Sequence, residues 1–164
     1  MANRKTLLVY YSRTGTTRAV AEAISAALPC DVEEIIDTKN RLGILGYLRS
    51  GFDAFFERPS TLKPTRYNPT DYDLVIVGTP VWNASLSAPV RTYLTTHKGK
   101  PKKVAFFCTY GGSGSRRVLG QMADASGVKA IDVLDVREGE VKRGEHVPRV
   151  RSFLANLTRA QAAA

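Results

Sequence analysis

The feature that most constrains this chain is a regular alternation of strand-like and helix-like segments along its whole length. Residues 6–12 (TLLVYYS) form a near-continuous apolar run, typical of a strand that is buried on both faces. Residues 16–28 then place apolar side chains at helical spacing and stop at Pro29. The same patterns predict further strands at 31–36, 74–77, 104–108 and 130–136, and further helices at 90–94, 115–125 and 146–160.

Strands separated by helices require right-handed crossovers, which give a parallel sheet covered on both faces. We therefore predict an α/β fold, a doubly wound sheet of five parallel strands. At 164 residues the chain is expected to be a single domain, residues 1–164. Ligands of such sheets bind at the carboxyl ends of the strands. The loops that begin at Ser12, Thr79 and Thr109 lie at such ends.

The composition narrows the possible partners and compartments. The formal charge is +9, but no RNA-binding aromatic signature or helix-turn-helix pattern accompanies it, so we expect a solvated basic surface and no nucleic acid. No apolar run of about 18 residues is present, so we expect no membrane span. The N-terminal apolar run is too short for a signal peptide, which favours a cytoplasmic protein. Cys30 and Cys108 fit no metal spacing and are expected to be core thiols.

The first of the three loops, residues 12–17 (SRTGTT), has the composition of a phosphate cradle. The N–H groups at a helix N-terminus are unpaired and attract anions. Hydroxyls of Ser12, Thr14, Thr16 and Thr17 add donors, and Gly15 allows a tight turn. The alternative interpretation is a helix cap with surplus threonines. The loop is neither a Walker loop, because the lysine is missing, nor a G-x-G-x-x-G fingerprint.

The S-x-T-G-x-T spacing after the first strand resembles that of the flavodoxin family, with Ser12, Thr14, Gly15 and Thr17 in register. The resemblance implies a flavodoxin-like sheet with strand order 2-1-3-4-5 and an FMN whose phosphate is held without a metal. Residues 75–94 resemble the family segment that wraps one face of the flavin ring, and within them the second loop, residues 79–84, would meet the polar edge of the ring. Trp82 lies beyond a predicted strand end, which favours stacking on the flavin over a place in the core. The third loop, residues 108–117, offers Tyr110 for the second face.

These three loops define the predicted cofactor site. The resemblance implies that FMN carries the chemistry, with no catalytic side chain and no metal. The predicted FMN-binding residues are Ser12, Arg13, Thr14, Gly15, Thr16, Thr17, Thr79, Pro80, Val81, Trp82, Asn83, Ala84, Thr109, Tyr110, Gly111 and Gly112.

Two functions compete within the flavin interpretation. One is an electron carrier that works with redox partner proteins, favoured because the sequence has no dedicated nicotinamide motif. The other is an FMN-dependent oxidoreductase that takes electrons from NAD(P)H and passes them to quinone. The basic charge, with Arg116 and Arg117 beside the third loop, departs from the acidic flavin edge of family carriers. A flavodoxin-like module without flavin is a lesser alternative, and the oligomeric state stays open.

Other functions fit the sequence less well. A hydrolase would need G-x-S-x-G, but Ser115 stands where the last glycine belongs. A low-molecular-weight phosphatase would need arginine six residues after Cys108, and Gly114 occupies that place. A receiver domain would need clustered aspartates at the strand ends. The apolar, glycine-containing segment from Arg41 to Arg58 predicts a helix that either approaches another group closely or packs on the sheet.

Overall fold

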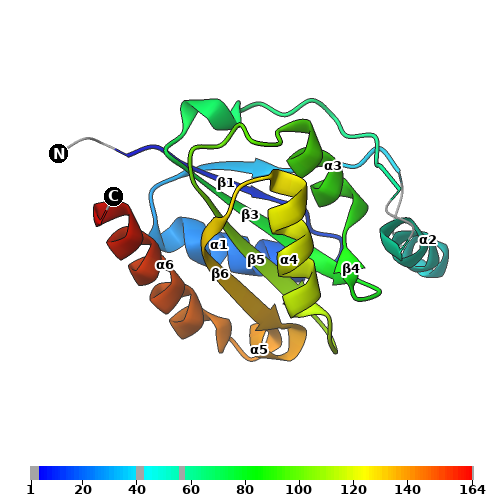
Figure 1. The fold of residues 1–164 in the computed structure, drawn as a ribbon. Helices are drawn as coiled ribbons and strands as arrows, with labels where there is room; N and C mark the ends of the chain where they lie inside the picture. The colour runs from blue at the N-terminus through cyan, green and yellow to red at the C-terminus, as the bar shows by residue number, and fades with distance from the viewer. Residues whose placement is uncertain (1–3, 40–42, 56–57, 164) are drawn as a thin grey trace.

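The computed structural model describes residues 4–39, 43–55 and 58–163. Its centre is a parallel sheet in the order β2-β1-β3-β5-β6 (Figure 1). The strands are β1 (Thr6–Tyr10), β2 (Asp31–Glu34), β3 (Leu74–Trp82), β5 (Val104–Tyr110) and β6 (Ala130–Arg137). A two-residue strand, β4 (Ser85–Leu86), pairs antiparallel with the end of β3. The predicted fold and strand order are confirmed, with β4 as an addition.

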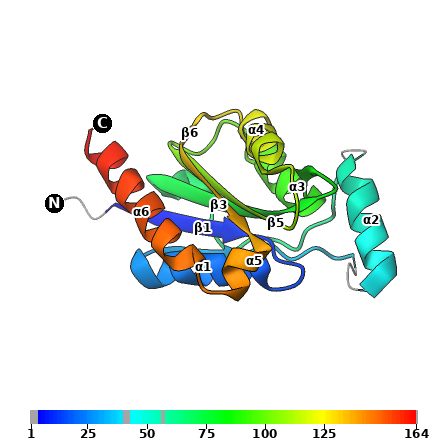
Figure 2. The same cartoon turned by 90° about the horizontal axis from the view of Figure 1, so that it is seen from below.

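Helices cover both faces of the sheet (Figure 2). The helices are α1 (Thr16–Ala27), α2 (Gly43–Phe55), α3 (Ala88–Thr96), α4 (Ser115–Ser126), α5 (Glu138–Lys142) and α6 (His146–Ala162), with a 3-10 turn η1 (Pro69–Asp71). Side chains of β1 alternate between the two cores because successive residues of a strand point to opposite faces. Leu7 and Val9 join the core under α3 and α4, whereas Leu8 joins the core under α1 and α6.

β3 extends five residues beyond the predicted strand, so residues 79–82 of the second loop belong to the strand. Gly78 pairs with Phe107 and Pro80 with Thr109, so the ladder to β5 continues past the apolar run. Trp82 then pairs with Ser85 of β4. The short elements β4 and α5 were not predicted, because two and five residues are too few to show a period.

The segment from Arg41 to Arg58 contains α2, as predicted, although residues 40–42 and 56–57 of it lie outside the described residues. α2 stands at one end of the molecule beside the β3–β4 hairpin and does not lie over a face of the sheet (Figures 1 and 2). Within the described residues, no helix is long and apolar enough to cross a membrane.

Candidate functional site

The carboxyl ends of β1, β3 and β5 bring the three predicted loops together around one small hollow of about 80 Å³. Most of the predicted site residues line it. The lining consists of Arg13, Thr14, Thr16, Thr17, Pro80, Val81, Trp82, Thr109, Tyr110, Gly111 and Glu138. Glu138, at the start of α5, is the one member of this lining that the sequence did not suggest.

The first loop ends in an open helix N-terminus. Gly15 precedes α1 with a left-handed φ of 98°, and no side chain caps the helix. The Gly15 N–H donates to the Ser12 hydroxyl at 3.1 Å, which closes the loop on itself. Thr14 is exposed and Thr16 half-buried. A Cβ added at Gly15 would meet no atom within 4 Å, so there is space above the loop. This end of α1 therefore has the unpaired N–H groups that suit an anion, and it faces open space.

Three buried threonines of the site bond to the protein itself. The hydroxyls of Thr17 and Thr109 lie 2.8 Å apart and tie the first loop to the end of β5. The Thr79 hydroxyl lies 2.8 Å from that of Ser87 and also donates to the Pro80 carbonyl. These hydroxyls hold the loops in register beneath the hollow. Their predicted role as FMN contacts stays a prediction.

Trp82 is not in a loop beyond a strand, as the sequence suggested. It is the last residue of β3 and is only 4% exposed, within the core under α3 and α4. Its ring packs edge-on against Tyr11 at 5.5 Å between centroids, and the Arg13 guanidinium lies 5.8 Å from it. The expectation that the strand end excludes a core position is wrong, because β3 pairs with β4 up to Trp82. Stacking on the flavin stays a prediction.

The tip of the β3–β4 hairpin carries backbone strain. Asn83 has a φ of 49° and Ala84 a φ of 54°, and they form the two-residue turn between the paired Trp82 and Ser85. Two left-handed central residues are the mark of a type I′ turn, which asparagine tolerates and alanine adopts at a cost. The tip is held from both sides. A Cβ at Gly51 of α2 would lie 3.6 Å from the Asn83 Cβ, and a Cβ at Gly114 would lie 2.7 Å from the Ala84 Cα.

A larger hollow of about 380 Å³ lies between α2 and this hairpin, and we call it the α2 hollow. Its lining is mainly apolar and aromatic: Arg13, Tyr47, Leu48, Ser50, Gly51, Phe52, Val81, Trp82 and Asn83. Arg13 and Trp82 line both this hollow and the hollow of about 80 Å³ among the three loops, so the two spaces are neighbours. The α2 residues were not among the predicted site residues. The glycine-containing apolar pattern of their segment was the signal that pointed to them.

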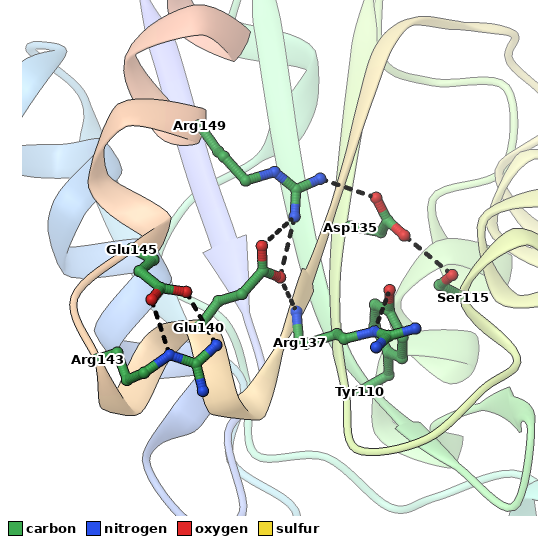
Figure 3. Close-up of polar contacts among 8 residues, drawn as sticks. All are labelled: Tyr110, Ser115, Asp135, Arg137, Glu140, Arg143, Glu145 and Arg149. Carbon is green, nitrogen blue, oxygen red and sulfur yellow. Dashed lines mark hydrogen bonds and ion pairs between the residues drawn. The ribbon is translucent and has the colours of Figure 1, made fainter.

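The third loop is fixed by a chain of polar contacts (Figure 3). Arg137 donates through Nε to the Tyr110 hydroxyl at 3.3 Å, which holds that ring at the edge of the site. Asp135 accepts from the Ser115 hydroxyl at 3.0 Å and from Arg149 at 3.2 Å. The pKa of Asp135 is lowered: burial acts to raise it, but the hydrogen bonds from Ser115 and Arg149 outweigh this.

Beside the third loop lies a further surface hollow of about 590 Å³, which we call the arginine hollow. Its lining is Tyr110, Gly112, Ser113, Gly114, Ser115, Arg116, Arg117 and Arg137. All three arginines are exposed. Three cations around one concave surface attract anionic groups over a distance of about 10 Å at moderate salt.

Other kinds of site find no support among the described residues. The described residues contain no cluster of three or more histidine, cysteine, aspartate or glutamate side chains that would hold a metal ion. Cys108 is buried, as predicted, and burial raises the pKa of its thiol to about 12, so it is not a thiolate nucleophile at neutral pH. Cys30 is half-buried.

A family model whose description is NADPH-dependent FMN reductase matches residues 7–147. The chain belongs to this family. Among solved structures, a flavoprotein from Lactobacillus acidophilus in complex with FMN is 25% identical, with a TM-score of 0.72 over 85% of this chain and 97% of that one. A putative flavoprotein from Bacteroides eggerthii is 24% identical, with a TM-score of 0.72 over 88% and 98% of the two chains. None of the curated proteins compared with the chain matches it.

Membership of the FMN reductase family confirms the predicted flavodoxin-like, FMN-binding flavoprotein. A structure of flavodoxin from Megasphaera elsdenii has the same fold, at 23% identity and a TM-score of 0.50 over 80% of this chain and 85% of that one. The residues present fit the cofactor. The uncapped end of α1, the open space above Gly15 and the threonine hydroxyls suit a phosphate, and Trp82 and Tyr110 are aromatic groups at the same hollow.

Proposed function

We propose that this FMN reductase family member takes electrons from NAD(P)H and passes them to a quinone-type acceptor. The observation that carries the proposal is the α2 hollow, which lies beside the hollow of about 80 Å³ where the three loops meet. Its volume of about 380 Å³ falls within the range of small-molecule pockets, about 300–1,000 Å³. The family description, which includes NADPH, supports a nicotinamide nucleotide as the electron donor.

The residues of the site divide into three roles. FMN, when bound, supplies the redox chemistry. The N–H groups at the start of α1 and the Thr14 and Thr16 hydroxyls hold its phosphate. Trp82 and Tyr110 orient the ring from the second and third loops. Tyr47 of α2 lines the α2 hollow together with Trp82 and gives it an aromatic wall suited to a planar ring.

The arginine hollow supports a preference for NADPH over NADH. The two nucleotides differ by one phosphate, and Arg116, Arg117 and Arg137 surround the concave surface next to Tyr110. Arginine is the side chain best suited to phosphate because its planar fork donates two parallel hydrogen bonds. We propose that these side chains attract the phosphates of the nucleotide while its nicotinamide reaches the flavin.

The electron-carrier function, which the sequence favoured, stays a prediction. Its support is the lack of a dedicated nicotinamide-binding motif in the chain. The family description, which includes NADPH, favours the oxidoreductase instead. The cytoplasmic location likewise stays a prediction.

Anaerobic titration of the FMN-loaded protein with NADPH separates these functions. We expect the absorbance of the oxidised flavin to fall in proportion to added NADPH and to return when a soluble quinone is added. Tyr47→Ala should slow both phases, because it removes the aromatic wall of the α2 hollow, while photoreduction of the flavin proceeds as in the unaltered protein. Tyr67→Ala, outside the linings of both hollows, is the matched control. A flavin that neither NADPH nor NADH reduces, but that a reductase protein does reduce, would identify a carrier.

A further inference from the structure

Helix α2 is amphipathic in the opposite sense to a normal surface helix. Its polar and small residues face the protein: Gly46 is buried, Ser50 is fully buried and Asp53 is 4% exposed. Its large aliphatic residues face outward: Ile44 and Leu45 are each 82% exposed and Leu48 is 61% exposed. A surface helix normally turns its apolar stripe to the core. A contiguous outward apolar face therefore indicates that another surface covers α2.

Cations border this apolar face. The Arg13 guanidinium lies 5.0 Å from the centre of the Tyr47 ring, and the Arg58 guanidinium lies 4.6 Å from the centre of the Phe52 ring. Arg49 is exposed on the helix itself. The acidic residue among the described residues of α2, Asp53, is buried. The outward face therefore combines aliphatic side chains with aromatic rings and arginines at its border.

We propose that α2 docks this protein on the surface of an anionic lipid bilayer. A helix that lies in the membrane interface places aliphatic and aromatic side chains at the acyl boundary and cations among the headgroups. Anionic lipids attract such cations, each contributing about 1 kcal/mol near the surface. The formal charge of +9 adds attraction between the whole protein and such a surface.

The charges favour a bilayer over a second copy of the chain as the covering surface. Two copies that met through α2 would bring the arginines around this face, Arg13, Arg49 and Arg58, of both protomers into one interface. Each protomer also has a formal charge of +9, so their approach is opposed. An anionic bilayer accepts the apolar residues and neutralises the arginines at the same time.

The position of α2 gives the docking a consequence for the site. Leu48 and Phe52 belong to the outward face and also line the α2 hollow. Docking would bring the mouth of this hollow to the bilayer, where lipid-soluble quinones reside. That consequence rests on the proposed function, whereas the docking itself does not, because it is measured without NADPH.

Sedimentation of the FMN-loaded protein with vesicles tests the inference. The vesicles contain equal parts of phosphatidylglycerol and phosphatidylcholine, or phosphatidylcholine alone. We expect binding to the anionic vesicles, weak binding to the neutral ones, and weaker binding as salt rises. Leu45→Glu should reduce the affinity by about tenfold or more, because one embedded leucine is lost and a charge is gained. Val133→Glu is the matched control, since Val133 is 46% exposed on β6 and undergoes the same charge change.

Retained FMN shows that Leu45→Glu is folded, and Ile44→Glu provides an independent second variant. Equal loss of binding in Leu45→Glu and Val133→Glu would show that only net charge acts, which overturns the role of α2. No binding of the unaltered protein to anionic vesicles overturns the inference too. So does a dimer seen in sedimentation velocity that Leu45→Glu abolishes, or binding of α2 to an acidic protein alone. NADPH reduction of Leu45→Glu without vesicles tests the proposed function separately.

Discussion

The first and third loops share one local design and differ in what lies above it. Each follows a parallel strand and ends at a glycine with a φ of 98°, Gly15 in one and Gly114 in the other. Each glycine precedes a helix of 12 residues whose N-terminus has no side-chain cap. Above Gly15 there is space, whereas the hairpin tip at Ala84 lies against Gly114.

The comparison teaches that the local sequence does not decide alone which helix N-terminus binds a ligand. The N-termini of α1 and α4 both carry unpaired N–H groups and the positive end of a helix dipole. The hairpin tip occupies the space beside the Cα of Gly114, although Gly114 and Ser115 also line the arginine hollow, whereas the space beside Gly15 is open. Because a Cβ at Gly15 would meet no atom within 4 Å whereas one at Gly114 would meet Ala84, we propose that the first loop holds the FMN phosphate. Under this proposal the third loop contributes Tyr110 and the arginines of the arginine hollow.

The largest effect is expected from Gly114→Ala. The new Cβ would lie 2.7 Å from the Ala84 Cα, which is backbone, and alanine would also be forced into the left-handed region. We expect a loss of about 2–4 kcal/mol in the free energy of unfolding. Thermal and denaturant unfolding measure this loss. Gly112→Ala is the control, because a Cβ there meets no atom within 4 Å. Equal stability of the two variants would show that the hairpin does not close the third loop.

Gly15→Val should reduce the affinity for FMN more than it reduces the stability of the fold. A Cβ added there would meet no protein atom within 4 Å, so we expect the cost to stability to be mainly the strain of a left-handed valine, about 1–3 kcal/mol. The side chain would occupy the space above the loop, and we expect FMN affinity to fall about ten- to hundredfold. Flavin fluorescence quenching measures the affinity. Gly99→Val is the control, because Gly99 has a φ of 72° and similar open space but is not part of the three loops, so this variant introduces the strain outside the site. Unchanged affinity in Gly15→Val would remove the phosphate from this loop.

Changes in the third loop are expected to slow the reaction with the electron donor and to leave FMN binding unchanged. Arg116→Glu combined with Arg117→Glu should leave FMN affinity unchanged and slow flavin reduction by NADPH about tenfold at low salt. The difference should shrink as ionic strength rises, because screening shortens the reach of the charges. Stopped-flow reduction over a range of salt concentrations measures it. Lys102→Glu combined with Lys103→Glu, in the connection before β5, gives the same charge change at another place. Rates that match between the two double variants would locate donor binding elsewhere.

The smallest effect concerns the contact that anchors the third loop. Hydrogen bonds from Ser115 and Arg149 lower the pKa of Asp135 against the opposing effect of burial. A lowered folded-state pKa contributes stability that is present above the unfolded value, about 3.9, and lost as pH falls through the folded value. Asp135→Asn should therefore cost stability at neutral pH and progressively less in acid. Both partners are more than a third exposed, so the cost is below about 1 kcal/mol.

Denaturant unfolding from pH 7 down to pH 2 follows that difference. Asp132→Asn is the control, because Asp132 accepts a hydrogen bond from the neutral Asn156. A stability difference between Asp135→Asn and the unaltered protein that stays constant with pH would contradict the lowered pKa.

The fold was predictable because its signals are local and strong. The run from Thr6 to Tyr10 is entirely buried, and Pro29 follows the end of α1 as the sequence indicates. The first loop was predictable for the same reason: its hydroxyls and Gly15 lie within six consecutive residues, and the register of strand and helix positions them. The cofactor followed from the resemblance of those residues to the flavodoxin family.

What could not be predicted depends on contacts between distant segments. Trp82 is buried because β3 continues through Gly78 and Pro80 by pairing with β5, and no apolar run marks that extension. The outward face of α2 is invisible to periodicity, because the same spacing of Ile44, Leu45 and Leu48 would suit a helix that packs on the sheet. The closure of Gly114 by Ala84 joins two loops 30 residues apart in the chain. Only the tertiary structure separates the open loop from the closed one.

The most direct test of the central claim, that the first loop holds the phosphate of FMN, compares the affinities for FMN and for riboflavin. The two flavins differ only in the phosphate, so the ratio of their affinities isolates the cradle. We predict that the unaltered protein prefers FMN by about a hundredfold or more, and that Thr14→Ala lowers this ratio about tenfold without changing the affinity for riboflavin. Equal affinities for the two flavins, or a ratio that Thr14→Ala leaves unchanged, would contradict the account.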